Sequence, residues 1–477
     1  MSILSHLLAL ATALPVPAPY SPPSTPQSFA AAVAAGKFQR TDSYLFGTGT
    51  TPTSPKQIQI PDLPTLAKYF KPYKPGTGLS TINYEIERFQ QFNSTNHAIG
   101  ANGLALTANL PTLPWPVVTK TLAQLPAGTN QLYLTDVSGI NLGQVAATQN
   151  FGSLLFVTAI DTTNNIVTFW STNAATGASP VISNQNSAYT TVDFLPIYVA
   201  TVSTSGGATS STVTCLPTSA GGTAPWPFPA QIVAGMQITA YGSSALGQPI
   251  IQSVNSSTGV ITLTGQAGVA YSVGQRILCM PPINSGQIWS NKNYWASASS
   301  LNKSVAIEVQ GILPTAQGSW PAAWLYGDGT YIRPTLNGCE IDIMEMYVSK
   351  STPKILNSLT LSAHNYAGSQ IGFSDKTTLG SWLSAFYWQP TYNVADGNVH
   401  KFQMIWTPSA VYFFLDDVYV ATVTGFTWSG QPATIGCNLA VGSVQGSSMQ
   451  IGLYPAHTPA SGVIDSFTIQ QINVWTL

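Results

Sequence analysis

The stretch Cys339-Glu340-Ile341-Asp342-Ile343-Met344-Glu345-Met346-Tyr347 gathers three carboxylates within six residues. Charged residues make up only 7% of the chain, so this density is unusual for the protein. The residues between and around the carboxylates are apolar and favour β-structure, and they predict a strand. Side chains alternate between the two faces of a strand, so we expect Glu340 and Asp342 to share one face.

Glu345 joins that face only if the strand is irregular. Strict alternation sends its side chain to the opposite face, and one extra residue, a β-bulge at Ile343 or Met344, brings it back. Carboxyl groups this close repel one another, so we expect one of the three to hold its proton near neutral pH. A retaining glycosidase requires such a pair, one carboxylate ionised and one carboxyl protonated, about 5–5.5 Å apart. A calcium site or a solvated edge strand is the alternative.

Further stretches on both sides of this run follow one another in a recognisable order. They are Gly318-Ser319-Trp320-Pro321-Ala322-Ala323-Trp324-Leu325 upstream, and downstream 396–402 (DGNVHKF) with 405–408 (IWTP), 411–417 (VYFFLDD), 438–442 (NLAVG) and 464–469 (IDSFTI). Together they resemble the laminarinase-like branch of glycoside hydrolase family 16, which has a bulged E-x-D-x-x-E strand. The resemblance implies an all-β catalytic domain, a jelly-roll β-sandwich of the concanavalin-like type.

The same resemblance assigns roles to the three carboxylates. Glu340 would be the nucleophile that attacks the anomeric carbon. Glu345 would protonate the leaving oxygen and later deprotonate the water that releases the glycosyl-enzyme. Asp342, between them, would hydrogen-bond the nucleophile and help to keep the pKa of the acid raised.

Several aromatic and polar residues are candidates for sugar binding. Trp320 and Trp324 are four apart in a predicted strand and therefore share a face, where they would either stack on sugar rings or pack in the core. His364 falls on the strand expected after the catalytic one. Trp382 and Trp388 would form a subsite wall or a hydrophobic plug. The full set of substrate-binding candidates is Trp320, Trp324, His364, Trp382, Trp388 and Asn438.

Catalysis by two carboxyl groups requires no cofactor. The resemblance adds one metal option, a structural calcium ion held by Asp465 on the closing strand together with backbone carbonyls. The five histidines are scattered and show no metal-ligand spacing.

Composition agrees with an all-β protein that acts on a neutral polymer. Hydrophobic residues reach 44%, and short β-rich runs alternate with clusters of Gly, Pro, Asn and Ser. The formal net charge is −1, and no cluster of Lys and Arg occurs, which argues against nucleic-acid binding. No stretch is long enough to span a membrane. Few charges and many polar residues suit an extracellular place of work: secreted, on a cell surface or on a virus particle.

The chain divides into four parts. Residues 1–27 are apolar and Pro-rich, and they read as a signal-like segment without a preceding Lys or Arg, or as an arm that docks into an assembly. Residues 28–81 form an N-terminal extension with one short helix and turns. The jelly-roll domain comprises 82–109 plus 283–477. Residues 110–282 are an insertion, because the strand expected soon after 103–108 appears only at Ser285-Gly286-Gln287-Ile288.

The insertion is internally repeated. The run Thr158–Phe169 parallels Gln252–Leu263, and each predicts a hairpin around a polar turn. The two copies predict two small β modules, at about 110–195 and 196–282. They would bind carbohydrate, or they would serve as a spacer or an assembly contact, as the N-terminal arm also would.

Four cysteines are too few for a disulfide framework in a chain of this size. Cys215 and Cys279 both lie in the insertion and could pair. Cys339 and Cys437 are expected to point between the two sheets, as buried thiols or as a bridge.

These features favour an endo-acting, retaining glycoside hydrolase on a β-linked polysaccharide, foremost a β-1,3- or mixed β-1,3/1,4-glucan. A depolymerase of exopolysaccharide, carried on a virus particle or a cell surface, is a second enzymatic interpretation. The third is a non-catalytic glycan-binding or structural protein that has kept the fold.

Overall fold

The computed structural model describes most of the chain outside its loops and its N-terminal arm. The described residues are 28–49, 51–72, 87–109, 118–124, 130–147, 155–171, 191–217, 228–240, 249–267, 270–294, 304–316, 319–327, 339–346, 359–365, 371–373, 376–379, 384–388, 393–408, 410–424, 433–441 and 463–477. The signal or arm prediction for residues 1–27 falls outside them. Within these ranges, no helix has the length and apolar character needed to cross a bilayer.

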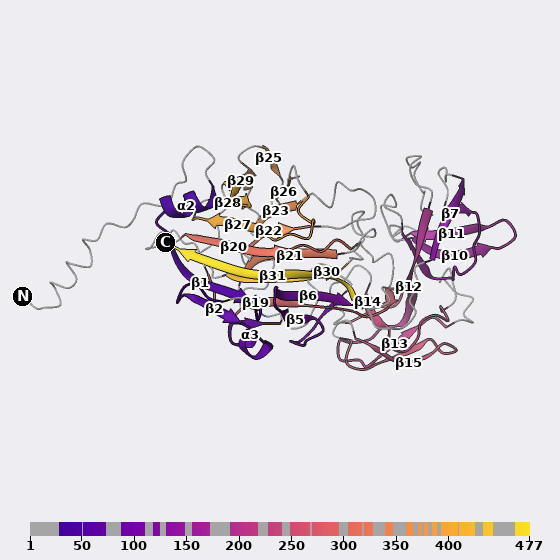
Figure 1. The fold of residues 1–477 in the computed structure, drawn as a ribbon. Coiled ribbons are helices and arrows are strands. Elements are labelled where there is room, and N and C mark those ends of the chain that lie inside the picture. The colour runs from indigo at the N-terminus through magenta and orange to yellow at the C-terminus, as the bar shows by residue number, and fades with distance from the viewer. Residues whose placement is uncertain are drawn as a thin grey trace, which may run out of the picture.

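Two sheets packed face to face form the larger part of the described structure (Figure 1). The first has seven described strands, in the order β26 (Ser384–Trp388), β23 (Leu359–Asn365), β22 (Cys339–Glu345), β21 (Ser319–Gly327), β30 (Ala433–Val441), β19 (Gln287–Ser290) and β3 (Phe70–Lys71). All of its neighbouring strands are antiparallel.

The opposing sheet has thirteen described strands and packs against the core-facing side of the first sheet. Its path runs β25 (Lys376–Leu379), β24 (Ile371–Phe373), β29 (Val418–Thr424), β28 (Ala410–Leu415), β27 (His400–Trp406), β20 (Val305–Ile312), β31 (Val463–Thr476), β6 (Gly103–Asn109), β18 (Ile283–Ser285) and β4 (Glu87–Phe89). Off this path, β1 (Gln39–Phe46) pairs with β31 and with β2 (Gln57–Ile60), and β5 (His97–Gly100) pairs with β6.

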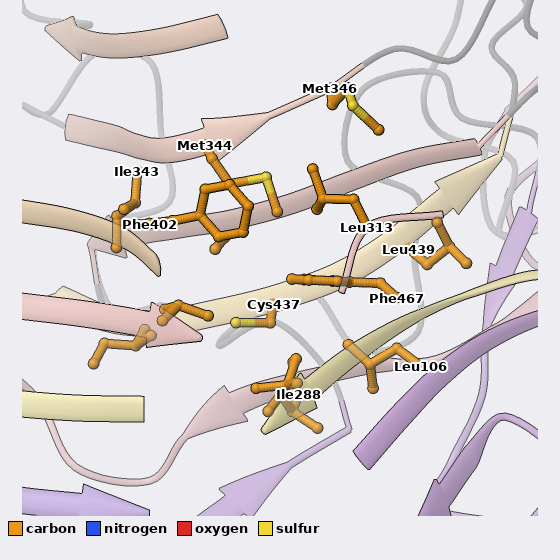
Figure 2. Packing of buried hydrophobic residues seen from close by; sticks show 14 of the residues in the cluster. Leu106, Ile288, Leu313, Ile343, Met344, Met346, Phe402, Cys437, Leu439 and Phe467 are labelled. Atoms are coloured by element: carbon orange, nitrogen blue, oxygen red, sulfur yellow. The ribbon is translucent and has the colours of Figure 1, made fainter. Parts of the chain in front are cut away.

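A continuous hydrophobic core fills the space between the two sheets (Figure 2). Ile343 of β22 and Leu439 of β30 come from one sheet, and Phe402 of β27 and Phe467 of β31 come from the other. These side chains point inward because residues alternate between the two faces of a strand. The outer face of each sheet therefore carries a different set of residues. The predicted all-β jelly-roll sandwich is confirmed.

The segment 28–72 belongs to this sandwich. Helix α2 (Phe29–Ala35) begins at the N-cap Ser28, as expected for a serine before a helix, and its Phe29 packs edge-on against Phe414 and Trp475. A second short helix, α3 (Leu63–Tyr69), follows the N-cap Asp62. Where the sequence predicted turns, β1 and β2 extend the thirteen-stranded sheet and β3 forms an edge of the other.

The described strands between 118 and 280 form a third sheet, which interrupts the sandwich in sequence only. Asn109 at the end of β6 and Asn284 in β18 are register partners, although the whole insertion lies between them. The ends of an inserted segment must lie close together for the host domain to keep its fold, and these do. Figure 1 shows the inserted strands as a lobe at one end of the sandwich.

Within this lobe, six described strands close into a small barrel. Strand β12 pairs with β7, and the ring continues through β8, β11, β10 and β9 back to β12. The strands are β7 (Val118–Gln124), β8 (Gln131–Leu134), β9 (Gln144–Ala147), β10 (Leu155–Asp161), β11 (Ile166–Ser171) and β12 (Thr191–Thr204). Their inward residues form a separate apolar cluster around Phe169 and Phe194.

A second ring of described strands repeats the first. The second half of β12 pairs with β13 (Thr212–Cys215) and β17 (Arg276–Met280), and β16 (Val260–Leu263), β15 (Ile251–Asn255) and β14 (Gln237–Ala240) complete the ring. An isolated bridge between Gln237 and Ile250 closes it. The long strand β12 therefore ends one barrel and begins the next.

The repetition extends to single hydrogen bonds. The amide of Gly143 donates to the carbonyl of Val157 at 2.8 Å, and the amide of Gly235 donates to the carbonyl of Ile251 at the same distance. The two predicted hairpins, β10–β11 and β15–β16, are present, and a residue with positive φ closes the turn of each, an asparagine in one and a glycine in the other. The insertion thus consists of two copies of one module.

The described cysteines are free thiols. Cys215 and Cys279 lie in the core of the second barrel, unbridged, and Cys437 lies in the sandwich core as expected. The side chain of Cys339 lies outside the described residues. The fold thus rests on apolar burial, without a bridge between these thiols.

One buried histidine makes the stability of the sandwich depend on pH. His97 is fully buried against Phe92, and its Nε2 donates to the carbonyl of Gln287 at 3.0 Å. Burial lowers the pKa of His97 from 6.5 to about 4, because the charged ring would lose its water. The unfolded chain therefore binds a proton that the folded chain excludes between these two pH values.

We expect the free energy of unfolding to fall by up to roughly 3 kcal/mol as the pH drops from 6.5 to 4. The loss is absent above pH 6.5, where the ring is neutral in both states. Urea unfolding at a series of pH values, on the wild type and on His97→Gln, measures it. The variant should be less stable at pH 7 but flatter over this window, and an equal pH slope in both proteins would contradict the assignment.

Candidate active site

The catalytic strand carries the predicted irregularity. Along β21 and β22, Ala323 pairs with Met344 and Trp324 pairs with Asp342, so Ile343 has no partner on β21. On the other side, the register between β22 and β23 also shifts between Asp342 and Glu345. The β-bulge expected at Ile343 or Met344 is confirmed, and both residues point into the sandwich core.

The bulge brings the three carboxylates to one surface of the seven-stranded sheet, which we call the site face. Trp320 of β21 donates its indole Nε1–H to Oε1 of Glu345 at 3.1 Å. Asp342 accepts a hydrogen bond from the hydroxyl of Ser362 on the neighbouring strand β23. Glu340 and Asp342 are buried, with 8% and 2% of their surface exposed, whereas Glu345 is half-buried. The carboxyl that would exchange protons with substrate and water is thus the one with most access to solvent.

Trp324 lies on the same face, deep in an aromatic cluster. Its indole Nε1–H donates to Oδ1 of Asn438 at 2.8 Å. Its ring packs edge to face against that of Trp289, with the ring centroids 4.8 Å apart. Trp289 in turn donates to Oε1 of Gln287, whose amide donates to the carbonyl of Pro72. Trp324 therefore packs among aromatic rings, whereas sugar stacking by Trp320 stays a prediction.

A glycine makes this cluster possible. Gly436 of β30 lies directly under the Trp289 ring, and a Cβ at this position would stand 2.6 Å from two ring carbons. Gly436 is also the register partner of both Trp289 and Trp324. The absence of a side chain lets the Trp289 ring lie across β30 and reach Trp324.

Sequence reasoning did not single out Ser362, Gln287 or Trp289. Ser362 is two residues from His364 on a predicted strand, so alternation alone places it on the site face. Gln287 and Trp289 follow the same alternation after Ser285-Gly286. Strand alternation would have found all three once the neighbouring strands were known.

The other candidate residues are placed only in part. His364 of β23 is the register partner of Glu340, and Trp388 ends β26, next to β23. Their side chains and the whole of Trp382 lie outside the described residues. Asn438 is the register partner of Ala322 and holds Trp324, so its contact with substrate stays a prediction.

Both carboxyl oxygens of Asp465 accept backbone hydrogen bonds. Its Oδ2 accepts the backbone N–H groups of Thr315 and Ala316 at 2.7 and 2.6 Å, and its Oδ1 accepts that of Ser466. Both oxygens thus face hydrogen-bond donors. No group of three His, Cys, Asp or Glu residues that could hold a metal occurs in the described part of the chain. Asp465 thus holds the 315–316 segment by hydrogen bonds, and calcium at this position stays a prediction.

Known proteins resemble parts of this chain. A β-glucanase from Rhodothermus marinus is 30% identical over 174 residues, which are 33% of this chain and 54% of that protein. An endo-1,3-1,4-β-glycanase from Rhizobium meliloti is 28% identical over 141 residues, 29% of this chain and 25% of that protein. The chain thus spans about half, or less, of the length of these curated relatives. The laminarinase catalytic domain from Thermotoga maritima has a TM-score of 0.30 and 20% identity, over 42% of this chain and 71% of that chain. No protein-family model matches.

The described structure is thus a jelly-roll sandwich with three carboxylates on one face of a bulged strand. The curated relatives are glucan hydrolases by name. They confirm, over part of the chain, the predicted resemblance to the laminarinase-like branch of glycoside hydrolase family 16.

The packing under Trp289 gives a test of the site's support. Gly436→Ala should destabilise the protein by about 1–3 kcal/mol, because the new methyl group forces the Trp289 ring away from Trp324. Urea unfolding measures the loss, and the near-ultraviolet circular dichroism of the tryptophans should change with it. Gly100→Ala is the matched control, since a Cβ there meets nothing within 4 Å. Equal effects of both substitutions would contradict this role of Gly436.

Proposed function

We propose that the protein is a retaining endo-glycoside hydrolase that cleaves a β-linked polysaccharide, foremost a β-1,3- or mixed β-1,3/1,4-glucan. The observation that carries the proposal is the bulge in β22, which turns Glu345 to the face of Glu340 and Asp342. With strict alternation Glu345 would instead point into the apolar core between the sheets, and the bulge prevents this. It brings two glutamates together, as double displacement requires.

In this proposal the two glutamates act in turn. The Glu340 carboxylate attacks the anomeric carbon while Glu345 gives its proton to the glycosidic oxygen, and the leaving chain departs as an alcohol. Glu345, now ionised, takes a proton from a water molecule. The water oxygen bonds to the anomeric carbon, and the bond to Glu340 breaks. The reaction needs no metal, and the configuration at the anomeric carbon is retained.

Asp342 supports this exchange from its buried position between them. The Ser362 hydroxyl donates to one of its oxygens and holds the carboxyl in place. A fixed negative charge on the same strand face opposes ionisation of its neighbours. It thereby helps Glu345 to remain protonated until the glycosidic oxygen arrives.

The residues of the site strands favour a neutral polymer. Strands β19, β21, β22, β23, β26 and β30 contain no Lys or Arg, and Lys71 on the edge strand β3 is the only such residue in the described strands of this sheet. A sulfated or carboxylated chain needs cationic partners, which these strands do not supply. Glucans are uncharged, and the names of the curated relatives point to the same substrate class. We also propose action outside the cytosol, since the charge-poor, polar composition suits contact with such a polymer.

The test is reducing-end release from laminarin, mixed-linkage barley glucan, agarose, κ-carrageenan and a bacterial exopolysaccharide. We expect the wild type to cleave laminarin or barley glucan. Glu340→Gln should lose at least about a hundredfold in rate, because an amide cannot act as the nucleophile. Proton NMR of the first product should show the β-anomer.

The other outcomes distinguish the alternatives. Activity on the exopolysaccharide alone would identify a depolymerase carried on a particle or cell surface. No activity on any polymer, with equal glycan binding by wild type and variant, would contradict the enzyme proposal and leave a binding protein.

A further inference from the structure

Trp320 and Trp324 lie on the same face of the sheet but have different neighbours. Trp324 packs with Trp289, Ala322 and Tyr326 in an apolar cluster. Trp320 is just as buried, at 4% exposed, but the only apolar cluster it joins within the described structure contains Ala440 alone. Trp320 thus lies outside the aromatic cluster of Trp324, and its described polar contact is with a carboxyl group.

That contact is the hydrogen bond from the indole Nε1–H to Oε1 of Glu345. The register explains how the two groups meet. Glu345 is paired with Ala322, so Trp320 lies one position away on the same face, along the diagonal between antiparallel strands. The bond exists only because the bulge returns Glu345 to this face.

We infer that Trp320 is a positioning residue for Glu345 in the proposed hydrolysis, and this inference rests on the proposed function. An indole N–H is a donor only, so the oxygen that it reaches must accept. Oε1 thus serves as the acceptor in both protonation states, and the transferable proton of the acid form resides on Oε2. The bond selects the oxygen that delivers the proton and fixes its direction.

This bond gives Oε2 of Glu345 the proton-transfer role in both steps of the reaction. In the first step the proton moves from Oε2 to the glycosidic oxygen as the carbon–oxygen bond breaks. In the second step Oε2 accepts a proton from water as the water oxygen bonds to the anomeric carbon and the bond from that carbon to Glu340 breaks. Oε1 keeps its bond to Trp320 throughout, so the carboxyl does not need to be reoriented between the two steps.

Trp320→Phe tests the inference, because it keeps an aromatic ring and removes the N–H. The substrates are aryl β-glycosides of the disaccharide that the wild type releases, with leaving groups from 2,4-dinitrophenol to phenol. A good leaving group needs no proton, whereas phenol does. We expect kcat/KM, which reports the first step, to fall on the order of tenfold for the phenyl glycoside and for the polymer, and to stay within about twofold for the dinitrophenyl glycoside.

Trp324→Phe is the matched control. It makes the same change on the same strand face, but the lost N–H bonds to Asn438 and not to a carboxyl. Its rate relative to the wild type should not vary along the leaving-group series. Glu345→Gln supplies the upper limit of the effect, with a much larger loss on the phenyl glycoside.

Each result has one meaning. A Trp320→Phe loss of kcat/KM that is equal for all leaving groups would overturn the inference and indicate sugar stacking. Wild-type inactivity on every glycoside would instead remove the proposed function itself. Retained activity on the dinitrophenyl glycoside shows that the variant has folded, and Trp320→Met is the second variant if the phenylalanine form does not fold.

Discussion

The bulge at Ile343 and Met344 is the constraint on which the site depends. Both side chains are buried in the core between the sheets, and the next residue, Glu345, lies on the other surface. One extra residue therefore serves two needs at once, apolar filling on one side and a third carboxyl on the other. Without it, the strand would direct a carboxyl into an apolar interior, which costs several kcal/mol unless the group is neutral and hydrogen-bonded. Core packing and site geometry are thus fixed by the same backbone irregularity.

The residues around the carboxylates extend this logic across the sheet. Ser362 on one side and Trp320 on the other each donate to a carboxyl of β22. Further along, Asn438, Trp289 and Gln287 hold Trp324 through a chain of hydrogen bonds and ring contacts that ends at Pro72. Pro72 belongs to the N-terminal extension, so this extension helps to hold the residues of the site face in place, although it lies far from the catalytic strand in the sequence. Rigid surroundings of this kind are what keep reacting groups in place.

Sequence reasoning reached the strand, the bulge and the shared face of Trp320 and Trp324, because alternation is a local property. Which of the two tryptophans is packed among aromatic rings was beyond it, since Gly436 and Trp289 come from other strands. The extension at 28–81 was interpreted as a helix with turns, and β1 and β2 were missed. Their residues, QRTDSYLF and QIQI, are largely polar, and they become strands by pairing with each other and with β31. The repeat in the insertion was visible as two hairpins, but ring closure depends on pairings between distant strands.

Strand β12 gives the insertion a property that neither barrel has alone. Its first half is hydrogen-bonded to β7 and β9, and its second half to β13 and β17, with no linker between. Two domains joined by a flexible segment can reorient relative to each other and can unfold independently. Here a bend at the junction would break ladder bonds in both modules, and fraying of one exposes the edge of the other. The two modules should therefore move as one stiff body, because the same strand belongs to both ladders.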